Sequence, residues 1–205
     1  MTVVAVVNPK GGVGKSTLAT HVAGYFARQG RTVMLGDVDR QQSSAQWLRL
    51  RPPQARSIVT WDASGQEVLK PPRGTTHVVI DTPAGVHGRM VKELLKRADK
   101  LLIPVQPSVF DIFATQAFLD ELTERRRAGG LEVAVVGMRV DERTLAAERL
   151  RAFLEGVGLP VLSCLRDTQN YVHLAAQGLT LFDVVPQQVA KDLAQWEPIC
   201  RWLDR

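Results

Sequence analysis

The sequence has few of the residues that build metal centres or disulfide frameworks. Only two cysteines and four histidines occur among its 205 residues. Cys164 and Cys200 form no CxxC pair and have no histidine at metal-ligand spacing, which argues against a zinc site and against a disulfide scaffold. Unpaired cysteines suit a reducing compartment, and we therefore expect a cytoplasmic protein.

Long apolar runs are also missing. No run approaches the roughly 20 apolar residues that a helix needs to cross a bilayer. The opening MTVVAVVNPKGG is interrupted too early to act as a secretory signal. The sequence shows no internal repeat, no low-complexity tract and no long linker, and 45% of its residues are hydrophobic, which suits one core. We expect a single domain over residues 1–205, without a helix-turn-helix domain ahead of the first strand.

Short apolar runs rich in β-branched residues alternate with stretches of helical periodicity. The runs lie at 3–7, 32–36, 57–61, 77–81, 100–105, 133–138 and 160–164, and the helical stretches at 16–29, 42–50, 88–98, 111–128 and 142–155. Continuous apolar character is typical of strands buried on both faces of a parallel sheet. The alternation predicts an α/β fold with a doubly wound, mostly parallel sheet flanked by helices on both faces.

The stretch NPKGGVGKST, at 8–17, joins the first expected strand to the first expected helix. Its end fits the phosphate-loop pattern GxxxxGK[ST], although Pro9 stands where the first glycine belongs. Backbone N–H groups of a glycine-rich turn at a helix N-terminus bind phosphate. We expect Lys15 to reach the β- and γ-phosphates of a nucleotide and Ser16 to ligate Mg²⁺. The expected nucleotide contacts in this loop are Gly11, Gly12, Val13, Gly14, Lys15, Ser16 and Thr17.

Three aspartates stand at the ends of expected strands. Asp81 ends the run HVVID, and Asp37 and Asp39 belong to GDVDRQ. In a parallel sheet these strand ends lie on the same rim as the phosphate loop. We expect Asp81 to bind Mg²⁺ as a carboxylate beyond its first ligand shell, and Asp37 to hold the metal's water shell. Asp39 would orient or activate the attacking water, and the alternative for Asp37 and Asp39 is capping of the helix at 42–50.

Four motifs together resemble the ParA/MinD family of deviant Walker A ATPases. They are KGGVGKST, DVDRQ, the VVIDTP strand and IPVQPS with Asp111, and the resemblance covers nearly the whole chain. It is nearest to small ParA-like proteins that partition or position a cargo. It implies a P-loop NTPase that binds ATP and Mg²⁺, hydrolyses ATP slowly, and is stimulated by an adaptor protein, ParB-like or cargo-specific. The sequence departs from the family's DxDPQ by having Arg40 in place of proline.

The resemblance also gives the second lysine of the loop a role. In the family this lysine, matched here by Lys10, reaches across an ATP-dependent homodimer to the partner's ATP, so Lys10 joins Lys15 and Asp39 as expected catalytic residues. Two triphosphates that face each other across an interface repel, and a lysine from each subunit offsets that repulsion. Each such contact is worth roughly 4 kcal/mol before desolvation at a surface-like dielectric.

The charge balance favours polyanions as partners. The net charge is +5, the pI is about 9.6, and 19 of the 26 basic residues are arginine. The resemblance implies that the dimer binds DNA without sequence preference and is nucleoid-associated. Its expected DNA contacts are Arg143, Arg149, Arg166 and Lys191. A second basic set, Arg89, Lys92, Lys96 and Lys100, falls near one helix face, for which a solvated surface is the alternative.

The base-binding region and the C-terminal segment are less well specified. We expect Met138 and Arg166, each at or after a strand end, to contact the base of the nucleotide. The C-terminal segment repeats apolar residues at helical spacing but has few lysines and arginines, so it should pack onto the sheet, without stable membrane association. Pro198 should kink or restart that helix. A MinD-like membrane-cycling ATPase for division-site placement remains the alternative function.

Overall fold

The computed structural model describes residues 1–60, 71–86, 88–125 and 130–205. Its strands are β1 (Thr2–Val6), β2 (Val33–Asp37), β3 (His77–Asp81), β4 (Lys100–Val105), β5 (Glu132–Val140) and β6 (Val161–Arg166). Its helices are α1 (Lys15–Arg28), α2 (Ser43–Leu50), α3 (Arg89–Arg97), α4 (Val109–Arg125), α5 (Leu145–Gly156), α6 (Gln169–Ala175) and α7 (Ala190–Leu203), with a 3₁₀ turn at Pro186–Val189.

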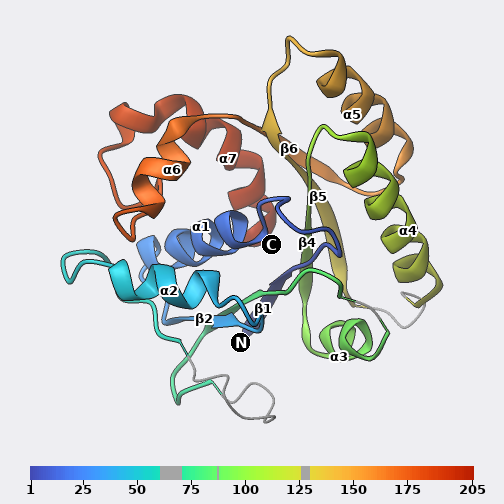
Figure 1. Ribbon diagram of the computed structural model, residues 1–205. Helices are drawn as coiled ribbons and strands as arrows, with labels where there is room; N and C mark the ends of the chain where they lie inside the picture. The colour runs from blue at the N-terminus through green and yellow to red at the C-terminus, as the bar shows by residue number, and fades with distance from the viewer. Residues whose placement is uncertain (61–70, 87, 126–129) are drawn as a thin grey trace.

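The strands form one parallel sheet in the order β2-β3-β1-β4-β5-β6 (Figure 1). The chain leaves β1 toward β2 and later returns to add β4 on the other side of β1. The connections after β1 and β4 therefore diverge at the carboxyl ends of two neighbouring strands. This divergence is the topological switch point at which open α/β sheets bind their ligands, and the expected doubly wound fold is confirmed.

Helices cover both faces of the sheet (Figure 1). On one face α1, α2, α6 and α7 enclose a core that contains Phe26, Trp47 and Trp196. On the other face α3, α4 and α5 enclose a second core with Phe118 and Leu150. Within β1, Val4 and Val6 face the first core and Val3 and Ala5 face the second, as the two-residue repeat of a strand requires. Burial on both faces explains why the strands read as continuous apolar runs.

The expected strand at 57–61 is the clearest error of the sequence analysis. Within 57–60 the structure has only a one-residue parallel bridge, Met34 to Val59, and residue 61 lies outside the described residues. Val59 donates its N–H to Val33 and accepts one from Leu35, at 3.0 and 2.8 Å. Ile58 is buried but its neighbours are exposed, so this segment touches the edge of β2 without extending the sheet. The last residues of the helix expected at 111–128 also lie outside the described residues.

The C-terminal helix packs onto the sheet, as expected. Trp196 and Ile199 of α7 are fully buried, in the same core as α1. Of the two expectations for Pro198, the restart is wrong, because α7 runs through it from Ala190 to Leu203, and the kink stays a prediction. Packing of the buried residues on either side outweighs the one hydrogen bond that a proline removes. No helix among the described residues is both long and apolar enough to cross a membrane.

Lys100 does not belong to a basic helix face, contrary to the sequence analysis. It is the first residue of β4 and its side chain is buried. Its Nζ donates to Glu132 at 2.9 Å and to the carbonyl oxygen of Trp202 at 3.0 Å. Lys100 thus anchors the end of α7 to the sheet instead of facing a polyanion.

Candidate nucleotide site

The glycine-rich loop leads into the N-terminus of α1. Its backbone adopts angles that residues with a side chain rarely adopt. Gly12 and Gly14 have φ angles of 79° and 93°, in the left-handed region. A Cβ on Gly14 would also lie 2.9 Å from Cε of Met138. Glycine is therefore favoured at Gly14 by its backbone conformation, whereas the flexible end of the Met138 side chain could shift to admit a Cβ. The loop leaves the first N–H groups of α1 directed at its concave side, where a phosphate can accept them.

Two polar side chains that the sequence analysis missed hold the loop to the switch point. Asn8 is fully buried and donates from Nδ2 to the carbonyl oxygen of Pro104 at 2.8 Å and to Oγ1 of Thr115 at 2.9 Å. Its Oδ1 accepts the N–H of Lys10 at 2.9 Å. Gln106 donates from Nε2 to the carbonyl oxygen of Gly12 at 2.9 Å. Asn8 and Gln106 each follow a strand that ends at the switch point, and this placement could have identified them from the sequence.

The two lysines of the loop have different environments. Lys15 is buried, and its Nζ donates to the carbonyl oxygen of Lys10 at 2.7 Å. Burial lowers the pKa of Lys15, while Asp81 and Asp39 favour its charged form. The side chain of Lys10 is exposed to solvent. Lys15 is thus directed into its own loop, whereas Lys10 remains available to a group outside it.

Asp81 provides a buried carboxylate beside the loop. Its register pairs it with Val6 of β1 and with Asp37 of β2, so the three strand ends meet. The hydroxyl of Ser44 donates to Oδ2, whereas the buried Oδ1 has no hydrogen-bond partner. Burial raises the pKa of Asp81 to about 6, although the nearby hydroxyl groups of Ser44 and Ser16 oppose the rise. Oδ1 of Asp81 has no hydrogen-bond donor and lies close to the Ser16 hydroxyl, so the two groups suit a divalent cation, which prefers oxygen ligands.

The metal would need ligands beyond the protein. The described part of the chain contains no group of three histidine, cysteine, aspartate or glutamate side chains placed to hold a metal ion. Mg²⁺ typically keeps several waters and takes one or two protein oxygens together with substrate phosphates. Ser16 and Asp81 therefore suit Mg²⁺ that arrives with a nucleotide.

The turn after β2 shows the capping role that the sequence analysis gave as the alternative for its aspartates. Oδ2 of Asp37 accepts the N–H groups of Ser44 and Ala45, at 2.8 and 3.1 Å, at the start of α2. Its Oδ1 accepts the N–H of Asp39 at 3.0 Å. Asp39 lies further out, is partly exposed, and accepts the N–H of Gln41 at 2.9 Å. Asp37 thus fixes the turn, and Asp39 is better placed to meet a water molecule at the rim.

A pocket of about 280 Å³ adjoins the loop, in the position expected for a nucleotide base. Its lining residues come from α1, from the ends of β5 and β6, and from α6: Gly14, Thr17, Met138, Arg139, Leu165, Arg166, Asp167, Thr168, Tyr171, Val172 and Ala175. The structure thus brings the predicted Met138 and Arg166 together with the predicted Thr17. Helix α6, which carries the aromatic ring of Tyr171, was not predicted from the sequence, because seven residues carry too little periodicity to identify a helix.

The structure shows ion-pair partners for two of the expected DNA contacts and places the other two on separate helices. Arg143 is exposed but pairs with Asp141 at 2.8 Å. Arg166 pairs at 2.6 Å with the fully buried Asp192, which ties the end of β6 to α7. Arg149 and Lys191 are exposed, yet they lie on α5 and α7, which cover opposite faces of the sheet (Figure 1). The structure therefore gives Arg166 a structural partner, and the role of the four residues in DNA binding stays a prediction.

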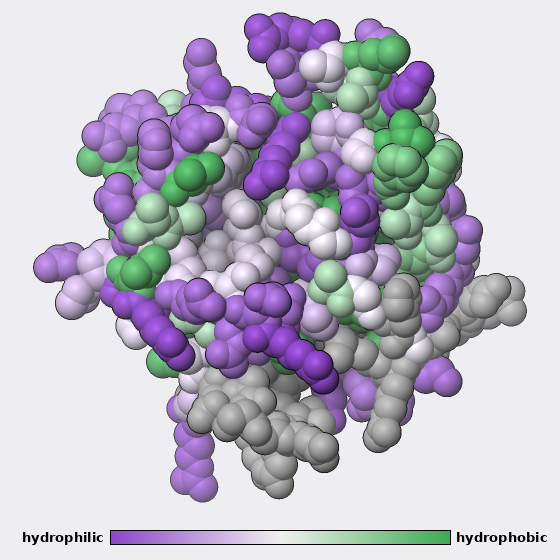
Figure 2. Space-filling model, viewed as in Figure 1, coloured by the Kyte–Doolittle hydropathy of each residue, from purple (hydrophilic) through white to green (hydrophobic). Residues whose placement is uncertain are grey.

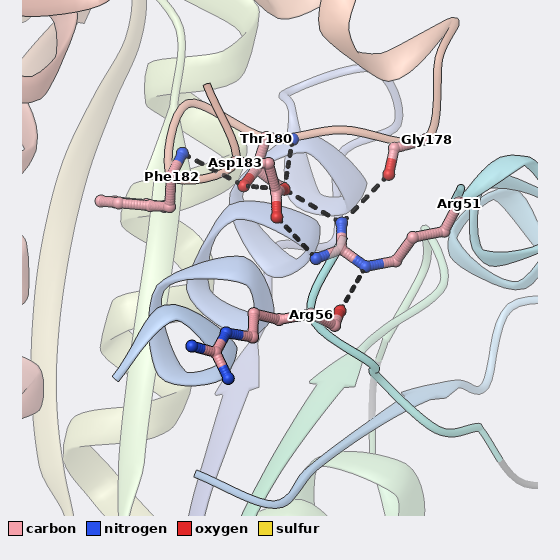
Figure 3. Close-up of polar contacts among 6 residues, drawn as sticks. All are labelled: Arg51, Arg56, Gly178, Thr180, Phe182 and Asp183. Atoms are coloured by element: carbon pink, nitrogen blue, oxygen red, sulfur yellow. Dashed lines mark hydrogen bonds and ion pairs between the residues drawn. The ribbon is translucent and has the colours of Figure 1, made fainter. Parts of the chain in front are cut away.

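A buried ion pair ties the far end of α2 to the segment after α6 (Figure 3). Arg51 donates to both carboxylate oxygens of Asp183, at 2.7 and 3.0 Å, and to the carbonyl oxygens of Gly178 and Arg56, at 3.1 and 2.8 Å. Thr180 donates its N–H and hydroxyl to the same carboxylate. The helix that begins at the aspartate turn is thus joined to the segment that follows the pocket-lining helix.

Comparison with known proteins places the chain among nucleotide-binding domains. Residues 4–182 match the family model "CobQ/CobB/MinD/ParA nucleotide binding domain". The chain is 31% identical to "Maintenance of carboxysome distribution protein A" of Gloeobacter kilaueensis over 213 aligned positions, covering 99% of this chain and 94% of that protein. It is 27% identical to "Chromosome-partitioning ATPase Soj" of Thermus thermophilus, with 74% of each chain covered.

Solved structures agree on the fold. The MinC:MinD cell division protein complex of Aquifex aeolicus matches with a TM-score of 0.77 at 16% identity, over 99% of this chain and 95% of that one. The complex of a Cyanothece McdA variant with ATP matches with a TM-score of 0.74 at 16% identity, over 99% of this chain and 95% of that one. At these identities the likeness shows a shared fold.

Proposed function

Because the chain belongs to the CobQ/CobB/MinD/ParA family of nucleotide-binding domains, we propose that it is an ATPase switch that dimerises with ATP, binds DNA non-specifically and segregates or positions a cargo. The family and its partition and positioning relatives support the broad role. The dimer, the DNA and the cargo are proposals that rest on the residues of the site.

The observation that carries the proposal is the contrast between the two lysines. Lys15 is buried and directed into the loop, so it is the one that serves the loop's own nucleotide. Lys10 is exposed in the same loop, although a loop of this type needs only one lysine. A second cation beside a triphosphate is useful where a second triphosphate approaches, as in a dimer with facing loops.

Each group of residues in the site would have a separate role in nucleotide binding or hydrolysis. Loop N–H groups and Lys15 would bind the phosphates, and Met138, Tyr171 and their neighbours would enclose the base. Ser16 and Asp81 would hold Mg²⁺, Asp81 through the metal's water, and the ion would neutralise phosphate charge. Asp39 would orient the attacking water, while Asp37 and Ser44 hold the turn that carries it. Lys10 would contact the triphosphate of the partner subunit.

The cargo divides into two classes. One is plasmid or chromosome DNA held by a ParB-like adaptor; the other is a protein assembly such as a carboxysome or a chemoreceptor cluster, held by its own adaptor. The names of the relatives include both partition and carboxysome distribution. In either case we propose a cytoplasmic, nucleoid-associated protein whose adaptor stimulates hydrolysis.

Light scattering with nucleotide tests the switch. Wild-type protein with Mg²⁺ and a non-hydrolysable ATP analogue should double its mass, whereas with ADP it should stay monomeric. Lys10→Ala should bind the analogue but remain monomeric, and Lys96→Ala, the same charge change on α3, should behave as wild type. A wild-type protein that stays monomeric with the analogue, or a Lys10→Ala variant that dimerises normally, would overturn the proposal.

Co-sedimentation then separates the partners. The ATP-analogue form should bind DNA of unrelated sequences equally and release it as salt increases. Anionic lipid vesicles form the second arm, because a membrane-cycling ATPase is the alternative. Vesicle binding without DNA binding would favour that alternative.

A further inference from the structure

The first two turns of α4 invert the usual arrangement of polar and apolar side chains. Phe110 is 77% exposed and Phe113 is 66% exposed, whereas Asp111 and Thr115 of the same turns are buried. Val109 adds a further apolar side chain at 39% exposure. Residues three apart lie on the same side of a helix, so the two phenylalanines form one surface. We call Val109, Phe110 and Phe113 the α4 patch.

The core of the molecule does not explain the α4 patch. Later in the same helix, Phe118, Leu119 and Leu122 fill the second core and are nearly fully buried. The helix therefore has its own buried face, and the patch lies outside it. Figure 2 shows hydrophobic side chains gathered over the region of α4 and α5 on this view of the molecule. Single exposed hydrophobic side chains are common, but neighbouring ones that form a contiguous apolar patch point to an interaction surface.

The α4 patch is held rigidly beside the phosphate loop. β1 and β4 are neighbours, so the loop that follows β1 and the helix that follows β4 begin at the same edge of the sheet. Gln106, three residues before the patch, binds Gly12, and Asn8 binds Thr115 within α4. Whatever approaches Lys10 and the glycines of the loop therefore approaches the α4 patch as well.

We propose that the α4 patch is a docking surface for a second copy of this chain, in contact with the same patch of that copy. The inference rests on the proposed ATP-dependent dimer and names a surface on which that dimer forms. When two copies face each other loop to loop, each α4 patch lies at the seam between them, because it is fixed to its own loop. An apolar surface suits a two-fold axis, since it can contact its own copy without placing like charges together.

The α4 patch and the lysines would contribute differently to the dimer. A phenylalanine contributes roughly 150–250 Å² when buried, so two from each copy supply a good part of the ~1,200–2,000 Å² of a stable interface. This contact is the same with any nucleotide. Selectivity for ATP then comes from Lys10, whose charge opposes association until a second triphosphate offsets it. Both parts are needed for a dimer that forms tightly and only with ATP.

Sedimentation or light scattering of substituted proteins tests the inference. In the double variant Phe110→Glu with Phe113→Glu, Kd for the ATP-analogue dimer should rise at least about 100-fold, because each dimer carries the change twice. Binding of the analogue by the monomer and the thermal midpoint should stay near wild type, since both side chains are exposed. Phe110→Leu with Phe113→Leu should retain the dimer.

A matched control is Leu50→Glu, which places the same charge on a 56%-exposed apolar residue at the far end of α2. It should dimerise as wild type. If wild type dimerises and the glutamate double variant dimerises equally well, the inference is wrong and the proposed function stands. If that variant dimerises but loses stimulation by an adaptor, the patch binds the adaptor instead. If wild type itself never dimerises, the proposed function fails and the inference fails with it.

Discussion

At the scale of single residues, the site combines groups that weaken the fold with groups that bind a ligand. Asp81 is the plainest case, because one of its oxygens is buried without a donor and its pKa is raised to about 6 by burial. The folded protein is less stable with a buried carboxylate in that position than with a neutral side chain of the same shape. The proposed Mg²⁺ site would account for its presence, as expected where stability and function conflict.

Asp81→Asn should therefore stabilise the protein while abolishing its chemistry. The raised pKa means that Asp81 favours folding below its ordinary pKa and loses that contribution as pH rises through about 6. Without nucleotide at pH 7.5, the asparagine variant should be more stable by about 1–3 kcal/mol in urea unfolding, and the gain should vanish near pH 4. Mg²⁺-dependent hydrolysis should be lost. A variant that is less stable at pH 7.5 would contradict this account of Asp81.

His21 should make the fold sensitive to acid. It is fully buried, stacks on Trp196 at 5.4 Å between ring centres, and burial lowers its pKa to about 4. In the unfolded chain this imidazole binds a proton below about pH 6.5, whereas in the folded protein it binds one only below about pH 4. The free energy of unfolding therefore falls as pH falls from about 6.5 to about 4. The loss should reach about 3 kcal/mol.

The comparison of His21→Phe with wild type isolates this contribution, since other titrating groups are common to both. In urea unfolding at pH 4.5 and 7, the variant should lose less stability on acidification than wild type. His173→Gln, a change on the exposed side of α6, should leave the wild-type pH dependence unchanged. Equal acid sensitivity of His21→Phe and wild type would show that His21 is not the group responsible.

At the scale of elements, α2 is fixed at both ends. Its first turn is bound by Asp37 and Ser44 at the rim, and Arg51 ties its last turn to Asp183 beyond α6. Burial opposes ionisation of Asp183, but the bonds from Arg51 and Thr180 outweigh it and lower its pKa. The position of the turn that carries Asp39 is therefore linked to the base pocket through one ion pair.

Arg51→Met should destabilise the protein by about 3–5 kcal/mol, because it leaves a buried carboxylate without its cation. Adding Asp183→Asn should recover part of that loss, since the amide oxygen still accepts from Thr180 without a charge. Chemical unfolding of the two single variants and the double variant measures the coupling. Arg49→Met, on the exposed side of α2, serves as the control and should be near neutral. Strictly additive losses would show that the pair is not coupled.

Elements that repeat a strong pattern could be predicted, and those fixed by tertiary contacts could not. The loop, α1 and the strands of the sheet follow from glycine spacing and apolar runs. Residues 57–61 have the composition of a strand but bridge β2 at one residue. α6 is too short to show periodicity, and so the wall of the pocket was missed. The buried side chain of Asn8 is decided by Pro104 and Thr115, which lie about a hundred residues away in the chain.

At the scale of the whole molecule, the net charge is +5, and Arg149 and Lys191 lie on helices that cover opposite faces of the sheet (Figure 1). Binding to DNA would then depend on how a dimer brings these surfaces together. Arg149 and Lys191 are the exposed members of the predicted set for which a substitution should leave the fold intact. Arg166 is different, because its removal leaves the buried Asp192 without its cation.

Arg149→Ala and Lys191→Ala should each reduce the salt dependence of DNA binding. Each lost phosphate contact lowers the log–log slope by about one, and a dimer loses two. The measurement is DNA affinity of the ATP-analogue form across a salt series. Thermal midpoints should stay near wild type for both variants and fall for Arg166→Ala. Unchanged slopes in both variants would remove these residues from the DNA interface.

The hydrogen bond from Lys15 to the Lys10 carbonyl has a consequence for the free energy of nucleotide capture. A phosphate that takes the Lys15 ammonium takes it from a neighbour that already accepts it, so capture is an exchange of acceptors rather than a simple addition. The number of hydrogen bonds that this ammonium makes is then unchanged by binding, so Lys15 adds less to nucleotide affinity than a whole charge-assisted hydrogen bond would.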